Sequence, residues 1–168
     1  MFSPAFARRV DFQIGMRLLS EDDRVLTNPR GNSLQFDETS EFRGKGRHFS
    51  ADELFLCSVL ASLGNTFLYF SRRRKTFSFA SLELNGSLSV EYDEDARAYR
   101  ITRVNVQGRL FVPEGHQKVA ARLWSLTERT CHVIRSVDAQ VRFDLDVRVE
   151  VSSPVAKVGN NGHDEAQP

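Results

Sequence analysis

The fold is decided by residues 50–75, which read SADELFLCSVLASLGNTFLYFSRRRK. Ser50 is a favourable N-cap, and Glu53 stands three residues later, where its carboxylate can complete a capping box. We therefore expect a helix from Ser50 to about Arg73. Residues 54–70 carry no charge, so the helix is apolar nearly all round and should be central and covered on most sides.

The same stretch does not read as a membrane span. It is shorter than the ~20 apolar residues that a bilayer requires, and Ser, Asn and Thr residues interrupt it. The basic run 72–75 falls at the end of the helix, where the helix dipole favours positive charge. No aromatic platform or second basic cluster accompanies this run, so we expect neither a nucleic-acid partner nor a membrane partner.

Outside this helix, the apolar residues follow strand and helix periodicities. Strands are expected at residues 10–20, 33–36, 80–92, 99–112 and 137–151. A second helix is expected from Pro113 to about Thr130, followed by a turn at residues 132–136. The order β-β-α-β-β-α-β predicts an α+β protein with one domain over residues 1–151 and a disordered tail over 152–168.

Composition excludes several classes of protein. The chain has 168 residues, of which 40% are hydrophobic and 27% charged, with a formal net charge of +1. These values indicate one soluble domain. Two cysteines cannot form a disulfide framework, no spacing suggests a metal site, and we expect no cofactor. The N-terminus lacks a signal sequence, so we expect a cytoplasmic protein with reduced cysteines.

Three features in this order resemble the OsmC/Ohr superfamily of peroxide-reducing proteins. Residues 50–56, SADELFL, are similar to the start of the central helix in that family. Cys131, followed by Val133 and then Arg135-Ser136, is similar to the segment that holds the second family cysteine. The alternating strand at 137–151 closes the chain as in the family.

The resemblance implies an intertwined homodimer with antiparallel sheets around a long central helix, and an oxidative-stress function. It also implies a two-thiol reaction, in which one cysteine reduces an organic hydroperoxide and a second forms a disulfide with it. An external thiol then restores both. An Arg and a Glu stabilise the first thiolate, and Arg17 and Asp52 match these positions, although Arg30 or Arg47 could compete with Arg17.

The position of the first cysteine is occupied by Ser62, ten residues after Asp52. A serine hydroxyl cannot pass through a sulfenate state, and it would need an adjacent base to act as a nucleophile. His48, His116 and His132 are available, but no nucleophile elbow supports hydrolysis. A plain helical role for Ser62 is therefore favoured.

Cys57 does not replace the missing thiol. It lies five residues before Ser62, which turns it about 140° around the helix and moves it ~7.5 Å along the axis. We expect it to be a small buried side chain among its apolar neighbours.

Cys131 matches the second family cysteine. Arg129, His132 and Arg135 are its neighbours in sequence and could favour its thiolate. Cys131 is either a lone redox thiol or the remnant of a disabled pair.

Two functions follow from these observations. The first is thiol-dependent hydroperoxide reduction through Cys131, with an apolar substrate lined by Phe55, Leu63 and Phe67. The second is a non-catalytic protein of the same fold that binds a small apolar ligand or partner.

Overall fold

The computed structural model describes residues 11–20 and 23–149 of the chain. Its elements, in chain order, are β1 (Gly15–Ser20), β2 (Asp23–Thr27), β3 (Ser33–Phe36), a short 3₁₀ helix (Ser40–Phe42), α1 (Ala51–Arg72), β4 (Ser81–Asp93), β5 (Ala98–Val112), α2 (Gln117–Thr130), α3 (His132–Arg135) and β6 (Gln140–Val149). The described chain is an α+β protein, as predicted. The predicted tail at 152–168 lies outside the described residues.

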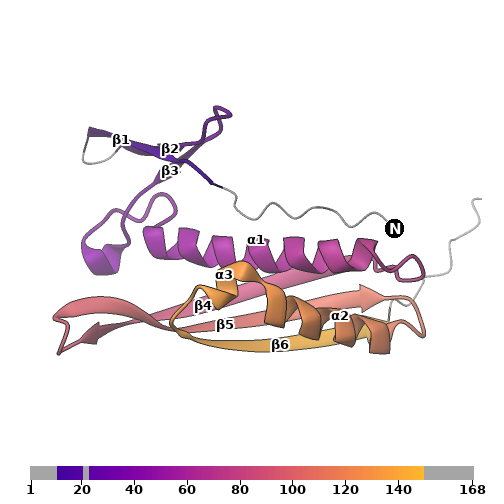
Figure 1. Cartoon of the computed structure of the whole chain (residues 1–168). Helices are drawn as coiled ribbons and strands as arrows, with labels where there is room; N and C mark the ends of the chain where they lie inside the picture. The colour runs from indigo at the N-terminus through magenta and orange to yellow at the C-terminus, as the bar shows by residue number, and fades with distance from the viewer. Residues whose placement is uncertain (1–10, 21–22, 150–168) are drawn as a thin grey trace, which may run out of the picture.

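The larger sheet has the strand order β4-β5-β6, and α1 and α2 cover one of its faces (Figure 1). β4 and β5 form a long antiparallel hairpin. β6 is parallel to β5, in register from Arg103 opposite Gln140 to Val112 opposite Val149, so the larger sheet is mixed and the expectation of purely antiparallel sheets is wrong for it. Parallel neighbours need a crossover connection, which α2 and α3 provide. The predicted turn at 132–136 is the single helical turn α3.

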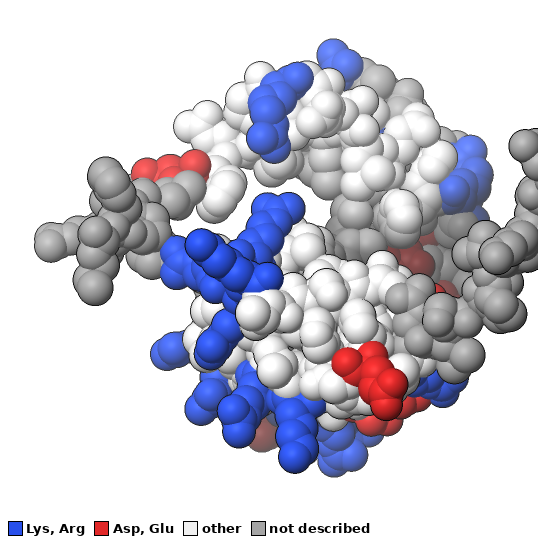
Figure 2. Space-filling view, turned by 90° about the vertical axis from the view of Figure 1, so that its right-hand side faces the viewer, with Lys and Arg blue, Asp and Glu red and all other residues white. Residues whose placement is uncertain are grey.

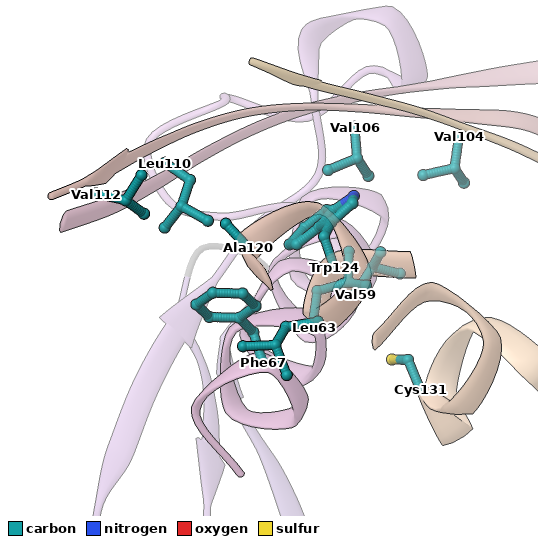
Figure 3. Close-up of a cluster of buried hydrophobic side chains, with 11 residues drawn as sticks. Val59, Leu63, Phe67, Val104, Val106, Leu110, Val112, Ala120, Trp124 and Cys131 are labelled. Atoms are coloured by element: carbon teal, nitrogen blue, oxygen red, sulfur yellow. The ribbon is translucent and has the colours of Figure 1, made fainter. Parts of the chain in front are cut away.

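The core lies between this sheet and the two long helices (Figure 3). Alternation along β5 directs every second side chain toward the helices. The buried apolar side chains of the core are Val59, Leu63, Phe67, Val104, Val106, Leu110, Val112, Ala120, Leu123, Trp124 and Cys131. Edge-to-face ring contacts of Phe67 with Phe77 and Phe79, with centroids 6.2 and 5.4 Å apart, extend the core at the C-terminal end of α1.

The long helix begins where the sequence predicts. The Ser50 hydroxyl accepts a hydrogen bond from the Glu53 backbone N–H (3.2 Å), and the Glu53 carboxylate accepts one from the Ser50 N–H (2.7 Å). These two bonds satisfy N–H groups that the first helical turn leaves free.

Only one side of α1 is covered within the chain. Leu63 and Phe67 have no exposed surface, whereas Cys57, Ser58 and Ala61 on the other side are exposed. The expectation that the helix is covered on most sides is therefore not met by a single chain.

The smaller sheet contains β1, β2 and β3 in that order, and Figure 1 shows it standing away from the larger sheet, beyond the start of α1. β2 was not predicted, because this strand is short and begins with two charged residues. Leu26 pairs with Met16 on one side and with Leu34 on the other, which aligns a row of apolar residues on one face. Met16 and Leu34 are nevertheless exposed.

Candidate functional site

Ser62 lies in the buried stripe of α1. Val59, Ser62, Leu63 and Phe67 recur at helical spacing and face the core. Ser62 is 8% exposed, and its carbonyl oxygen accepts an additional hydrogen bond from the Thr66 hydroxyl (2.7 Å). The rigid capped helix therefore holds the Ser62 hydroxyl at the edge of the core.

Cys131 occupies the junction between α2 and α3. Its backbone is extended, with φ −60° and ψ 113°, so it ends one helix and begins the next. Its N–H donates to the Thr127 carbonyl (2.9 Å), and its own carbonyl accepts from the Arg135 N–H (3.1 Å). The side chain is fully buried, and Figure 3 shows it pointing from the junction toward α1.

These two residues meet. The Ser62 Oγ lies 3.2 Å from the Cys131 Sγ, within hydrogen-bonding distance, although 69 residues separate them in sequence. Either atom can be the donor of this bond. The structure thus brings together the two residues that the sequence resemblance matched to the family's cysteine pair.

A groove of about 830 Å³ runs along the open side of α1 and reaches this pair. Ala61 and Tyr69 contribute apolar wall, and Ser62, Thr130 and His132 are among the polar residues that line it. Cys131 does not line the groove. A small molecule in the groove would therefore meet the Ser62 hydroxyl before the thiol.

The apolar residues that sequence reasoning assigned to the substrate site do not line this groove. Leu63 and Phe67 are core residues, and Phe55 packs against the core. Sequence reasoning also missed the lining residues Thr130 and Tyr69. His132 was already singled out as a neighbour of Cys131, and Thr130 could have been found from its position on the other side of that residue.

Within one chain, Asp52 and Arg17, the residues matched to the family's acidic and basic partners, do not reach the Ser62–Cys131 pair. Asp52 lies in the first turn of α1, ten residues and therefore about 15 Å along the axis from Ser62. Arg17 is an exposed residue of β1. Of its two competitors, Arg47 forms an ion pair with Asp37 (3.9 Å), and Arg30 is exposed in the turn before β3.

Cys57 is exposed, so the expectation of a small buried side chain is wrong. The reason is that α1 presents this side to solvent within one chain. Cys57 and Ser62 lie on different sides of the helix, as their separation in sequence predicts.

Among the residues that the structure describes, no histidine forms a hydrogen bond with the Ser62 hydroxyl, so no hydrolytic arrangement is present there. His116 stacks on Phe77, with ring centroids 5.7 Å apart, and its Nδ1 contacts the Ser78 backbone. His132 lines the groove, but the hydroxyl of Ser62 bonds to Cys131 rather than to a histidine. Within residues 11–20 and 23–149, no group of three His, Cys, Asp or Glu side chains could hold a metal ion.

The pKa of one carboxyl close to Cys131 in sequence, that of Glu128, is shifted. Burial raises the pKa of Glu128, three residues before Cys131, and the indole N–H of Trp124 acts in the opposite direction. In the folded protein the neutral form of this carboxyl is therefore favoured more than it is in water.

Comparison with known proteins identifies a family model that matches the chain. Residues 44–146 match the family model described as OsmC-like protein. No curated protein sequence matches the chain.

Solved structures show the same fold. An OsmC-like protein of unknown function from Vibrio cholerae has a TM-score of 0.73 and 9% identity, covering 82% of this chain and 99% of that one. The organic hydroperoxide resistance protein OsmC from Legionella pneumophila has a TM-score of 0.64 and 15% identity, covering 84% and 100%. An organic hydroperoxide resistance protein from Elizabethkingia anophelis has a TM-score of 0.64 and 11% identity, covering 84% and 99%. With the family model matching more than half of its length, the chain belongs to the OsmC-like protein family.

Proposed function

We propose that this protein is a thiol-dependent reductase of organic hydroperoxides that works through the single thiol of Cys131. The observation that carries the proposal is the contact between the Cys131 Sγ and the Ser62 Oγ beside the groove. Relatives of the same fold are named organic hydroperoxide resistance proteins, which supports this substrate class.

The reaction balances with one protein thiol. The Cys131 thiolate attacks one peroxide oxygen, the O–O bond breaks, and the alcohol leaves after taking up a proton. Cys131 is then a sulfenic acid. An external thiol attacks the sulfenic sulfur and releases water, and a second external thiol reduces the mixed disulfide, which regenerates Cys131. The external thiols are oxidised to a disulfide.

In this scheme Ser62 assists without changing its oxidation state. Its hydroxyl can donate a hydrogen bond to the thiolate at 3.2 Å, which favours the charged sulfur. Because Ser62 lines the groove and Cys131 does not, the Ser62 side chain has to turn aside for the peroxide to reach the sulfur.

The complete burial of Cys131 favours a second candidate function. A thiol with no exposed surface reacts slowly with any dissolved oxidant. The protein would then use the groove to bind a small apolar ligand without chemical turnover. Ser62 would act as a polar contact at one end of that groove.

We also propose that the working unit is a homodimer. α1 exposes one side. Met16 and Leu18 of β1, and Ile14 just before it, expose apolar side chains. Exposed apolar surfaces of this kind favour a protein partner, and a second copy of the chain can cover both. Asp52 and Arg17, which lie away from the pair in one chain, can then contribute only from the other subunit.

The test compares consumption of an organic hydroperoxide, with a small dithiol as reductant, by four proteins. These are the wild type, Cys131→Ser, Ser62→Cys and, as a matched thiol control, Cys57→Ser. We expect the wild type and Cys57→Ser to turn over and Cys131→Ser to be inactive. Loss of activity in Cys57→Ser would contradict the proposal, because a different thiol would then be the reactive one.

Two other outcomes distinguish the candidates. An inert wild type together with an active Ser62→Cys would favour the ligand-binding function on a peroxidase site that has lost its first thiol. Activity that persists in Cys131→Ser would exclude Cys131 as the reactive thiol and with it the proposed mechanism.

A further inference from the structure

The C-terminal end of α1 carries a basic surface that the proposed reaction does not use. We define the basic end as Arg72, Arg73, Arg74, Lys75, Lys118 and Arg122. All six side chains are exposed. Figure 2, which views the molecule from this end, shows Lys and Arg gathered along one side of it.

Two separate parts of the chain build this surface. The Phe77 N–H donates to the Arg74 carbonyl (2.9 Å), which folds the segment after α1 back on itself. The Phe77 ring stacks on His116, the residue before α2. Lys118 and Arg122 follow on the exposed side of α2, one turn apart, so the structure supplies the second basic cluster that the sequence alone did not reveal.

The charge is segregated rather than general. The whole chain has a net charge of only +1, and no acidic residue occurs between Phe70 and Leu82. Glu114 is the exposed acidic residue beside the start of α2. Further acidic residues, Asp93, Glu94 and Asp95, lie at the tip of the β4–β5 hairpin, at the opposite end of the molecule in Figure 1. Such a distribution orients the molecule in front of a negatively charged surface.

Apolar wall lies directly beside the cations. Tyr69, Phe70 and Arg73 line the end of the groove that is nearest to the basic end. The Arg73 guanidinium lies 4.1 Å from the centroid of the Tyr69 ring, which places the cation over an aromatic face. The six exposed cations at this end match the anionic headgroups of a lipid surface.

We propose that the basic end docks the protein onto membrane surfaces that contain anionic lipids. Single-stranded nucleic acid would need aromatic faces for stacking, but the Arg73 guanidinium already occupies one face of the Tyr69 ring at this end. Docking does not depend on the proposed function. The benefit of bringing the protein to the lipid surface, where apolar hydroperoxides concentrate, does rest on it.

The experiment is co-sedimentation of the full-length protein with vesicles, in the absence of peroxide. One set of vesicles contains phosphatidylcholine with phosphatidylglycerol, and the other contains phosphatidylcholine alone. The test variant is Arg72→Gln/Arg74→Gln/Lys75→Gln. The control variant, Arg103→Gln/Arg109→Gln/Arg142→Gln, removes equal charge from the outer face of the larger sheet, where these side chains are exposed.

We expect the wild type to bind the anionic vesicles, and its binding to weaken as salt is added. The test variant should lose on the order of a hundredfold in partitioning, whereas the control should lose less than about threefold. Equal binding to both kinds of vesicle, or equal losses in the two variants, would overturn the proposal. So would tighter binding to single-stranded RNA than to anionic vesicles at the same salt concentration. Circular dichroism checks that both variants fold.

Because the readout is vesicle binding, it is separate from peroxide turnover. An inert enzyme that still docks would contradict the proposed function alone. An active enzyme that does not dock would contradict this inference alone.

Discussion

The two sheets of this protein use similar alternating strands but treat their apolar side chains differently. In the larger sheet, Leu110 and Val112 of β5 have no exposed surface, because α1 and α2 cover that face. In the smaller sheet, Met16 and Leu18 of β1 are 58% and 61% exposed. The same alternating pattern therefore gives a buried core in the larger sheet and an exposed apolar face in the smaller sheet.

This difference shows which part of the chain buries its apolar side chains without a partner. Apolar strand faces are stabilised only when another element removes them from water. The larger sheet and the helices supply this cover within one chain. The smaller sheet does not obtain it there, which supports the proposal that a second copy covers it.

The largest expected effect is the loss of dimerisation through the apolar face of the smaller sheet. Met16→Asp/Leu18→Asp places two charges on its apolar face, where a partner would have to bury them. We expect the dimer dissociation constant to rise at least about a hundredfold, measured by size-exclusion chromatography with light scattering. Gln35→Asp, on the opposite face of the same sheet, is the control and should stay dimeric. A wild type that is monomeric at micromolar concentration would contradict the dimer.

The second prediction compares the two regions by truncation. Phe67→Ala should lower the free energy of unfolding by about 3–5 kcal/mol, because it opens a cavity in a filled core. Ile14→Ala should change it by less than about 0.5 kcal/mol, because that side chain is exposed in the single chain. Both are measured by denaturant titration in the Met16→Asp/Leu18→Asp background, so that dissociation does not contribute. Similar losses at the two sites would remove the distinction between the regions.

The third prediction concerns the point where the two regions join. Ser50→Ala removes the side-chain acceptor of the capping box at the start of α1 and should cost about 1 kcal/mol. Ser58→Ala is the matched control, since its hydroxyl donates only to the Phe55 carbonyl on the exposed side of the helix. Chemical unfolding of both variants measures the difference, and an equal effect would mean that the cap is not important for stability.

The smallest expected effects concern the pH dependence of stability. Asp37 and Glu128 should contribute to it with opposite signs. The backbone N–H of Glu38 is the main cause that lowers the pKa of Asp37, burial opposes it, and Arg47 adds to the lowering. A carboxyl whose pKa is lowered in the folded state stabilises the protein above about pH 4. This contribution is lost as the pH falls. Glu128 has a raised pKa, so its contribution is present at low pH and is lost as the pH rises through its folded-state pKa.

Thermal unfolding as a function of pH tests these signs. Relative to the wild type, Asp37→Asn should lose stability at neutral pH and little at acidic pH. Glu128→Gln should gain stability at neutral pH relative to the wild type, by a small amount because solvent reaches the carboxyl. The same sign for both variants would show that the two carboxyls do not differ in this way.

Much of the larger region could be predicted from the sequence. The capping box at Ser50 and the alternation in β6 are local signals, so they gave the start of α1 and the closing strand. Cys131 and Ser62 were identified by resemblance, but their contact depends on α2 packing along α1, which no local pattern contains. β2 was missed because a short strand with two charged residues depends on its neighbours for its structure.

The candidate groove was predicted less well, for a physical reason. Sequence reasoning assigned Leu63 and Phe67 to it because they are large and apolar, but such residues are used first to fill the core. The groove instead uses residues on the open side of α1, such as Ala61 and Tyr69. Cys57 was expected to be buried by the same reasoning, and it is exposed on that open side.

The parallel pairing of β6 with β5 also determines when the protein can finish folding during synthesis. The β4–β5 hairpin can form as soon as its two strands leave the ribosome, because its contacts are close in sequence. The other edge of β5 has to wait for Gln140–Val149, which follows α2 and α3 in the sequence. Until then an unpaired strand edge and its apolar residues are open to neighbouring chains. The nascent protein therefore depends on β6 for protection from aggregation.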